Sequence, residues 1–390
     1  MKEIYLDHAS TTPPSKEVVQ SMLEVLEKDY GNPSSLHRKG IKAEAYIKET
    51  SELIANHLKV LPNEIYYTSG GTESNNIAIF GVAEGYKRNG RHLITTQIEH
   101  PSVLAPFKKL ESQGYEVTYL PVNEEGYIDL NTLEKAIRSD TILVSIMHVN
   151  NEIGTIAPIE AIGELIKKVN PHTLFHVDGV QSFAKLPIYP KRWEIDFLSM
   201  SGHKIHGPKG IGVLYATKGN KLNPLQYGGD QQKGLRSGTE NTPGIAGLYM
   251  AVKNAYESLE ESRGSIYQLK QRLVRHLTTE IKGTYIQGPN LEEGSPYIVN
   301  VRFDGVRGEV LLHALEDKNI YISTGSACSS HKSNKSATLQ ALGLSDEQIL
   351  SSIRISLSPN TNEEDIQTFI KEVKNIIPML RKFTQGGKKR

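Results

Sequence analysis

Short apolar runs alternate with amphipathic stretches along the first 255 residues of the chain. Near-continuous apolar runs of this length are typical of strands in a parallel sheet that is covered on both faces. Residues 159–169 repeat their apolar positions with helical spacing between two of these runs. The alternation predicts an α/β fold with a mostly parallel sheet. We expect its strands at 93–96, 142–147, 174–178 and 195–200.

The first helix is predicted to begin at Ser15, whose hydroxyl suits an N-cap, and to end at Gly31. Its apolar face is expected to be formed by Val18, Met22, Val25 and Leu26.

After about residue 255 the pattern changes to long helices with isolated strands. A helix is expected over 259–282, and strands near 298–301 and 353–356. The last helix is predicted to start at a capping box formed by residues 361–364. Its buried stripe is expected to be Ile366, Phe369, Ile370 and Val373.

These patterns divide the chain into two predicted domains. Residues 15–255 are expected to form a large α/β domain, and residues 1–14 and 256–390 a smaller α+β domain.

The composition limits the classes of function. The chain has 390 residues, 38% hydrophobic and 23% charged, and a net charge of +1, so no basic field favours direct nucleic-acid binding. A single cysteine excludes an internal disulfide and a multi-cysteine metal site. No apolar run is long enough for a membrane span, and the charged start argues against a secretory signal, so we expect a cytoplasmic protein.

That single cysteine, Cys328, stands in a run of small polar residues, 323–330. A structural cysteine usually lies in an apolar segment, whereas a thiol on a polar loop can ionise and attack. A chance exposed thiol is the alternative.

Lys204 lies among Ser, His and Gly residues in 201–210, directly after a predicted strand. A partly desolvated lysine at a strand end can form a Schiff base. Otherwise it is a surface lysine on a glycine-rich turn.

Three further strand ends carry suitable groups. Gly71 and Thr72 precede a helix and can hold an anion, without the pattern of a Walker A loop. Asp178 can pair with a protonated ring nitrogen, or simply cap a helix. His100 can stack on a flat ring, or be structural, and residues 150–152 can offer an amide or make a turn. Together these groups describe a site for pyridoxal 5′-phosphate.

The chain resembles the cysteine desulfurases of the NifS/IscS-like group in the class-V aminotransferase family, with the pyridoxal-phosphate aminotransferase-like fold (fold type I). The resemblance extends over nearly the whole chain. It rests on residues 4–9, 30–37, 68–75, 99–100, 148–154, 176–178, 201–210, 236–239, 325–328 and 354–356.

The resemblance implies a role for each matching residue. Lys204 would hold the cofactor covalently, and Cys328, Lys204 and His100 would be catalytic. The cofactor-binding residues would be Gly71, Thr72, His100, Asn151, Asp178, Gln181, Ser201, His203, Lys204 and Thr239, the last from the partner subunit. Asn32 and Arg354 would hold the substrate carboxylate. No metal is expected beyond a transient contact of Cys328 with an iron–sulfur cluster on a scaffold.

The implied activity converts L-cysteine to L-alanine, with a persulfide on Cys328 that passes to an acceptor in iron–sulfur assembly or tRNA thiolation. A homodimer is implied by the resemblance alone. Residues 329–336 depart from the family pattern through Lys332 and Lys335, which suit a more acidic acceptor, and Gly71 replaces a common alanine. A selenocysteine lyase or another thiol-independent lyase, and a non-catalytic sulfur-handling scaffold, are the alternatives.

Overall fold

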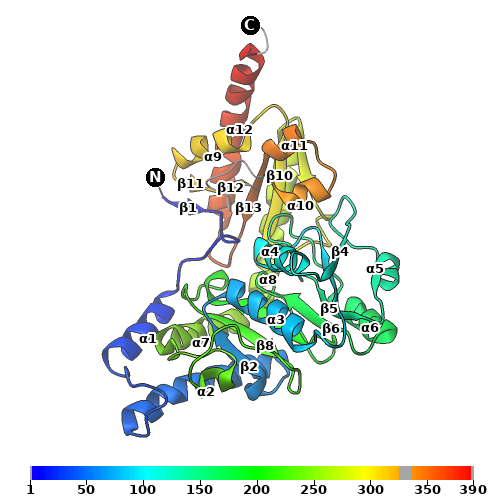
Figure 1. Ribbon diagram of the computed structural model, residues 1–390. Helices are drawn as coiled ribbons and strands as arrows, with labels where there is room; N and C mark the ends of the chain where they lie inside the picture. The colour runs from blue at the N-terminus through cyan, green and yellow to red at the C-terminus, as the bar shows by residue number, and fades with distance from the viewer. Residues whose placement is uncertain (1, 325–334, 388–390) are drawn as a thin grey trace.

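A seven-stranded sheet forms the centre of the computed structural model, which describes residues 2–324 and 335–387 (Figure 1). Its strand order is β2-β8-β7-β6-β5-β3-β4, and β8 alone runs antiparallel to its neighbours. The predicted mostly parallel sheet is therefore confirmed. The strands are β2 (Ile65–Thr68), β3 (His92–Thr96), β4 (Glu116–Leu120), β5 (Thr141–Ser145), β6 (Leu174–Asp178), β7 (Phe197–Ser201) and β8 (Gly212–Ala216).

Helices cover both faces of this sheet, which explains why its strands are apolar at consecutive positions. Ile94 and Val144 pack with α2, α6 and α7, whereas their neighbours Leu93 and Leu143 pack with α3 and α4 on the opposite face. The helices are α1 (Lys16–Glu27), α2 (Arg38–Leu58), α3 (Gly71–Gly85), α4 (Pro101–Glu111), α5 (Leu130–Ala136), α6 (Ile159–Val169) and α7 (Thr242–Glu257), with short 3-10 turns η1 (Pro62–Glu64), η2 (Gly202–Lys204) and η3 (Gln231–Gly234).

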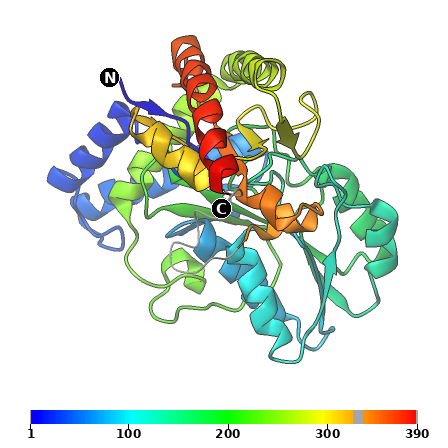
Figure 2. The same cartoon turned by 90° about the horizontal axis from the view of Figure 1, so that it is seen from above.

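A second, smaller body lies beside the large sheet, with the C-terminal helix projecting from it (Figures 1 and 2). A four-stranded antiparallel sheet, β12-β13-β10-β9, packs against helices in its own apolar cluster. Its elements are α8 (Leu259–Glu280), β9 (Thr284–Gln287), β10 (Ile298–Phe303), α9 (Gly308–Glu316), β11 (Ile320–Tyr321), β12 (Ser323–Thr324), α10 (Ala337–Ala341), α11 (Asp346–Leu350), β13 (Ser352–Ser356) and α12 (Glu363–Gly387).

The N-terminal segment joins the two bodies. Strand β1 (Ile4–Tyr5) pairs in parallel with β11, and Asp7 forms a bridge to Ser356 of β13. The chain then crosses to the large sheet, where the Thr12 backbone N–H donates to the His203 carbonyl at 2.9 Å. The two-domain division is consistent with this layout, but its limits at residues 15 and 255 stay a prediction.

Two predicted helix ends are wrong. Helix α1 starts at the Ser15 cap as expected but ends at Glu27 instead of Gly31, because Lys28 already forms its C-cap. Leu26 is 57% exposed, so its predicted place on the buried face is also wrong.

The capping box of the last helix begins at Asn362, one residue later than the predicted start at Thr361. Asn362 and Asp365 exchange the reciprocal backbone–side-chain hydrogen bonds, at 3.1 and 3.0 Å. The hydroxyl of Thr361 instead accepts the Ser358 backbone N–H, so this residue closes the preceding turn. The predicted buried stripe of α12 is confirmed, since all four of its residues are buried.

Strand β8 approaches the turn after β2 so closely that Gly212 has no room for a side chain. A Cβ atom at Gly212 would lie 2.5 Å from the Cα of Gly70. We expect Gly212→Ala to lower the free energy of unfolding by about 1–3 kcal/mol in urea denaturation. Gly264→Ala is the matched control, because its Cβ would meet nothing within 4 Å in a helix and should be neutral or stabilising by up to about 1 kcal/mol. Equal effects of the two changes would contradict the packing argument.

Candidate active site

One cavity of about 300 Å³ gathers most of the predicted site residues. Strands β2, β3, β5, β6 and β7 all point the same way, so the loops at their carboxyl ends meet at one edge of the sheet. The predicted residues that line the cavity are Gly71, Thr72, His100, Asn151, Asp178, Gln181, Ser201, His203, Lys204 and Arg354.

Three predicted residues are not brought into this cavity. Asn32 and Thr239 are exposed and do not line it in the single chain. Cys328 lies outside the described residues. Their roles stay predictions.

Lys204 reaches toward the N-terminal segment from η2, directly after β7. Its Nζ donates to the carbonyl oxygens of Ala9 and Ser10 at 2.6 and 2.7 Å. The segment that joins the two bodies thus also orients the amine within the cavity. Sequence reasoning did not identify Ala9 and Ser10, because they are far from Lys204 along the chain.

Asp178 is buried at the end of β6, where each of its two carboxylate oxygens accepts a hydrogen bond. Its Oδ2 accepts from the Nδ2 of Asn75 at 2.8 Å, and its Oδ1 accepts from the Val180 backbone N–H at 3.0 Å. Hydrogen bonds of this kind stabilise the charged form of a carboxyl group. A fixed anion at the sheet edge is the group that a protonated ring nitrogen requires.

Glu99 lies just behind this anion and is kept neutral. Burial, and secondarily the charge of Asp178, raise the pKa of the Glu99 carboxyl to about 8. Its Oε1 accepts from the Thr96 hydroxyl at 2.8 Å and from the Met147 backbone N–H at 2.9 Å. At neutral pH the carboxyl therefore keeps its proton, so the site holds one buried anion here instead of two. The sequence motif contained Glu99 but did not reveal this burial.

His100 is the N-cap of α4. Its Nδ1 accepts the Ser102 backbone N–H at 3.1 Å and lies 2.7 Å from the Ser102 hydroxyl. Burial lowers the pKa of the His100 imidazole, so the ring stays neutral. A neutral ring at this edge can stack on a flat cofactor without adding charge to it.

The expected phosphate end of the cavity lies at the start of α3. Gly71 and Thr72 begin this helix, whose first backbone N–H groups face an anion favourably. The hydroxyl of Ser201 is buried and has no hydrogen-bond partner among the described residues. His203 joins them, with its Nδ1 3.1 Å from the Thr11 hydroxyl, and burial lowers its pKa to about 4. The first backbone N–H groups of α3, the Ser201 hydroxyl and the His203 ring are donors that fit a phosphate group.

Arg354 enters the cavity from β13 of the smaller body. Its Nη1 donates to the Asn151 carbonyl at 2.9 Å, and its Nη2 to Asp7 Oδ1 at 2.8 Å and to the Ser10 hydroxyl at 2.5 Å. It is only 6% exposed. The guanidinium is thus held in place at the mouth formed by both bodies, as a carboxylate-binding group needs to be.

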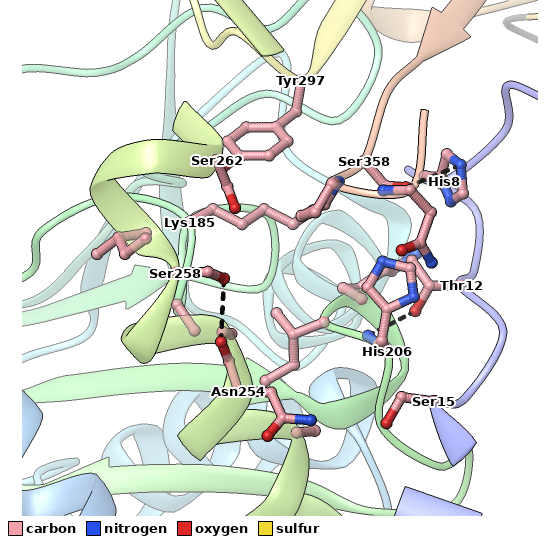
Figure 3. A pocket seen from close by; sticks show the side chains of 18 of the residues that line it. His8, Thr12, Ser15, Lys185, His206, Asn254, Ser258, Ser262, Tyr297 and Ser358 are labelled. Carbon is pink, nitrogen blue, oxygen red and sulfur yellow. Dashed lines mark hydrogen bonds between the residues drawn. The ribbon is translucent and has the colours of Figure 1, made fainter. Parts of the chain in front are cut away.

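A second cavity of about 220 Å³ shares Lys204 with the first as a lining residue. Figure 3 shows this second cavity. Lys185, Ser262 and Tyr297 lie on one side of it, opposite His8 and His206. Nζ of Lys185 donates to Gln181 Oε1 at 3.4 Å, and burial, followed by the charges of Lys204 and Arg354, lowers the Lys185 pKa to about 7.

Lys185 fixes the direction of the Gln181 amide. The Lys185 Nζ donates to Gln181 Oε1, the Gln181 Nε2 donates to the Ala9 carbonyl at 2.9 Å, and Gln181 lines the first cavity. Sequence reasoning missed Lys185, because only its burial distinguishes it from an ordinary lysine.

Comparison with known proteins agrees with this geometry. The aminotransferase class-V family model matches residues 4–369. The chain belongs to the cysteine desulfurases of this aminotransferase class-V family. It is 44% identical over 383 residues to cysteine desulfurase IscS of Methanosarcina thermophila, covering 98% of this chain and 94% of that protein. It is 42% identical over 380 residues to IscS of Dictyoglomus turgidum, covering 97% and 96%.

Solved structures agree on the fold. A NifS-like protein superposes with a TM-score of 0.91 at 39% identity, covering 97% of this chain and all of the other. SspA in complex with cysteine gives a TM-score of 0.80 at 38% identity, covering 93% of this chain and 100% of the other. The predicted family, fold and enzyme class are confirmed.

Enzymes of this family depend on pyridoxal 5′-phosphate, which confirms the predicted cofactor for this desulfurase. Asp178, Lys204 and the donors around Ser201 are the residues that fit it. Within residues 2–324 and 335–387, no group of three His, Cys, Asp or Glu side chains forms a metal site. No helix in that part of the chain is long and apolar enough to span a membrane.

The neutral state of Glu99 can be tested through the pH dependence of stability. A carboxyl whose pKa is raised from 4.5 to about 8 on folding stabilises the fold below pH 4.5, and this contribution is lost as the pH rises through 8. Glu99→Gln does not titrate, so its free energy of unfolding relative to the parent should rise between these pH values.

The measurement is urea denaturation of the apoprotein across that range, with the exposed Glu124→Gln as control. We also expect Glu99→Gln to retain cofactor, since a neutral amide replaces a neutral acid. A stability difference that is flat with pH would mean that Glu99 is ionised in the fold.

Proposed function

We propose that this protein is a cytoplasmic desulfurase that converts L-cysteine to L-alanine and transfers the sulfur to Cys328 as a persulfide. The observation that carries the proposal is one cavity shared by the Lys204 amine, the buried Asp178 carboxylate and the Arg354 guanidinium. The relatives named cysteine desulfurase, and the cysteine bound to SspA, support cysteine as the substrate.

Each side chain of the cavity would have a role that its charge or hydrogen-bonding groups allow. Arg354 would bind the substrate carboxylate with its two-pronged guanidinium, exchanging part of its present contact with Asp7. Asn32 would assist it. Asp178 would pair with the ring nitrogen, and Gln181 and Asn151 with the ring oxygen. Bound pyridoxal phosphate supplies an electron sink for the charge that develops at the substrate Cα. The amine of Lys204, or His100, would take the α-proton.

Sulfur transfer needs a second nucleophile. The Cys328 thiolate attacks the substrate sulfur, and an S–S bond forms as the substrate C–S bond breaks. The electron pair of that bond returns to the carbon skeleton, which takes up protons and leaves as alanine. A low-pKa or readily ionised thiol favours this attack.

The persulfide would then pass to an acceptor protein in iron–sulfur assembly, in tRNA thiolation, or in both. The two lysines after Cys328, Lys332 and Lys335, favour an acidic acceptor. Their combined positive charge toward an acceptor is smaller than the sequence implies. Lys335 forms an ion pair with Asp346, so its charge is partly balanced within the chain.

A homodimer would complete the site. Tyr30, Leu36 and Ile41 are 70%, 95% and 57% exposed, and Tyr227 on the segment before Thr239 is 81% exposed. Large exposed apolar side chains of this kind mark interaction surfaces. Tyr30, Leu36 and Ile41 lie near Asn32 along the chain, and Tyr227 precedes Thr239; Asn32 and Thr239 are the described site residues that the single chain leaves outside the cavity. A partner subunit would supply Thr239 to the phosphate.

The function is tested by adding cysteine to the holoenzyme, its Cys328→Ser variant and its Lys204→Ala variant. The parent should release alanine and carry one extra sulfur on Cys328, detected by mass spectrometry. Cys328→Ser should keep the cofactor spectrum and lose at least about 100-fold in alanine release, because no thiolate removes the sulfur.

Full activity of Cys328→Ser on cysteine or selenocysteine would favour a thiol-independent lyase. A parent that binds no cofactor would favour the scaffold alternative.

The shared site is tested by mixing two inactive variants. Lys204→Ala lacks the amine, and Thr239→Asp should repel the phosphate from the partner subunit's cavity. In a mixed dimer, one cavity contains both changes and the other contains neither. Refolding the two variants together should restore up to about one quarter of the parent activity per subunit, for random pairing. No recovery over either variant alone would contradict the shared site.

A further inference from the structure

A continuous hydrogen-bonded path connects His100 to Asp178. The His100 Nδ1 lies 2.7 Å from the Ser102 hydroxyl, which lies 2.9 Å from Asn75 Nδ2. The same Nδ2 lies 2.8 Å from Asp178 Oδ2. Asn75 comes from α3 and Ser102 from α4, so two helices on one face of the sheet are joined beneath the site.

The direction of every proton in this path follows from donor and acceptor types. Asp178 as a carboxylate only accepts, so Asn75 must present its NH₂ group and not its oxygen. The second N–H of that group points to the Ser102 oxygen. This oxygen accepts from Asn75 through one of its two lone pairs. When His100 Nδ1 is unprotonated, the Ser102 hydroxyl can donate its proton to that nitrogen.

A second donor acts on the same nitrogen. The Ser102 backbone N–H, 3.1 Å from His100 Nδ1, is a donor and never an acceptor. A proton on Nδ1 would therefore face this backbone N–H and would break the cap of α4. The one proton of neutral His100 is confined to Nε2.

We propose that Ser102 and Asn75 are positioning residues that hold His100 as a neutral imidazole protonated at Nε2. In this state His100 can donate a hydrogen bond or a proton from Nε2, but has no free lone pair with which to take the α-proton. The acceptor of that proton is then the amine of Lys204. The assignment of His100 and Lys204 to these steps rests on the proposed function, whereas the tautomer does not.

The charges around His100 have opposite effects on the pKa of its ring. The Asp178 carboxylate favours a protonated imidazole, whereas Lys204 and Arg354 and, above all, burial disfavour it, so the pKa of His100 is lowered. Glu99, the preceding residue, keeps its own proton at neutral pH. The two donors on Nδ1 act in the same direction as burial.

The test is nitrogen NMR of the full-length protein labelled with ¹⁵N-histidine, with and without the cofactor. The chain has 13 histidines, so the His100 signals are those lost in His100→Gln. We expect an unprotonated Nδ1 and a protonated Nε2 in both forms at neutral pH. A protonated Nδ1 in the parent protein would overturn the proposal.

Ser102→Ala tests the role of the hydroxyl. It removes one donor to Nδ1, so His100 should take up a second proton at a pH higher by roughly 0.5–1 unit than in the parent. Ser102→Thr retains a hydroxyl and should restore the parent behaviour. Ser51→Ala is the control, because Ser51 is equally buried, at 8%, and lies outside the cavity lining.

A His100 ring that resists protonation equally in Ser102→Ala and in the parent would overturn the role of Ser102. Alanine release from cysteine, measured on the same samples, keeps the two proposals apart. Loss of that activity in the parent would contradict the desulfurase function while leaving the tautomer result in force.

Discussion

A single buried anion governs the electrostatics of the site. Asp178 is the carboxylate at the centre of the sheet edge, and it is stabilised by Asn75 and by the Val180 backbone N–H. A second unpaired anion in the same low-dielectric region would be costly. Burial accordingly keeps the neighbouring Glu99 carboxyl protonated, and burial separately keeps the His100 and His203 rings unprotonated.

The N-terminal segment links this electrostatic arrangement to the architecture. Its carbonyl oxygens at Ala9 and Ser10 hold the Lys204 amine, while Asp7 holds Arg354. The amine and the guanidinium come from different bodies of the protein, so their separation depends on this short connecting segment. A shift of one body relative to the other would therefore change the distance between the Lys204 amine and the Arg354 guanidinium.

Much of this site could be predicted from the sequence because parallel strands place their carboxyl ends at one edge. Lys204, Asp178 and His100 each follow a recognisable strand, and all three line the same cavity. The limits of individual elements were less predictable. Helix α1 ends at Glu27, with Lys28 as its C-cap. The apolar periodicity through Leu26 does not indicate this end.

The supporting residues could not be predicted, because their roles arise from contacts between distant segments. Asn75 resembles any polar residue of an amphipathic helix until α4 brings Ser102 within 2.9 Å of it. Lys185 differs from most lysines of the chain through its burial, which the sequence does not show. Asn32 and Thr239 were named by the family resemblance, but they lie outside the cavity of the single chain, so their roles stay predictions.

We propose that the Lys204 amine and the Asp178 carboxylate together hold pyridoxal phosphate. Borohydride reduction of the holoenzyme, followed by peptide mass spectrometry, tests it most directly. We expect the reduced pyridoxyl group on Lys204 alone, and a much lower yield of this peptide in Asp178→Asn. A label on Lys185, which lies beside the same cavity, or an undiminished Lys204 label in Asp178→Asn, would contradict it.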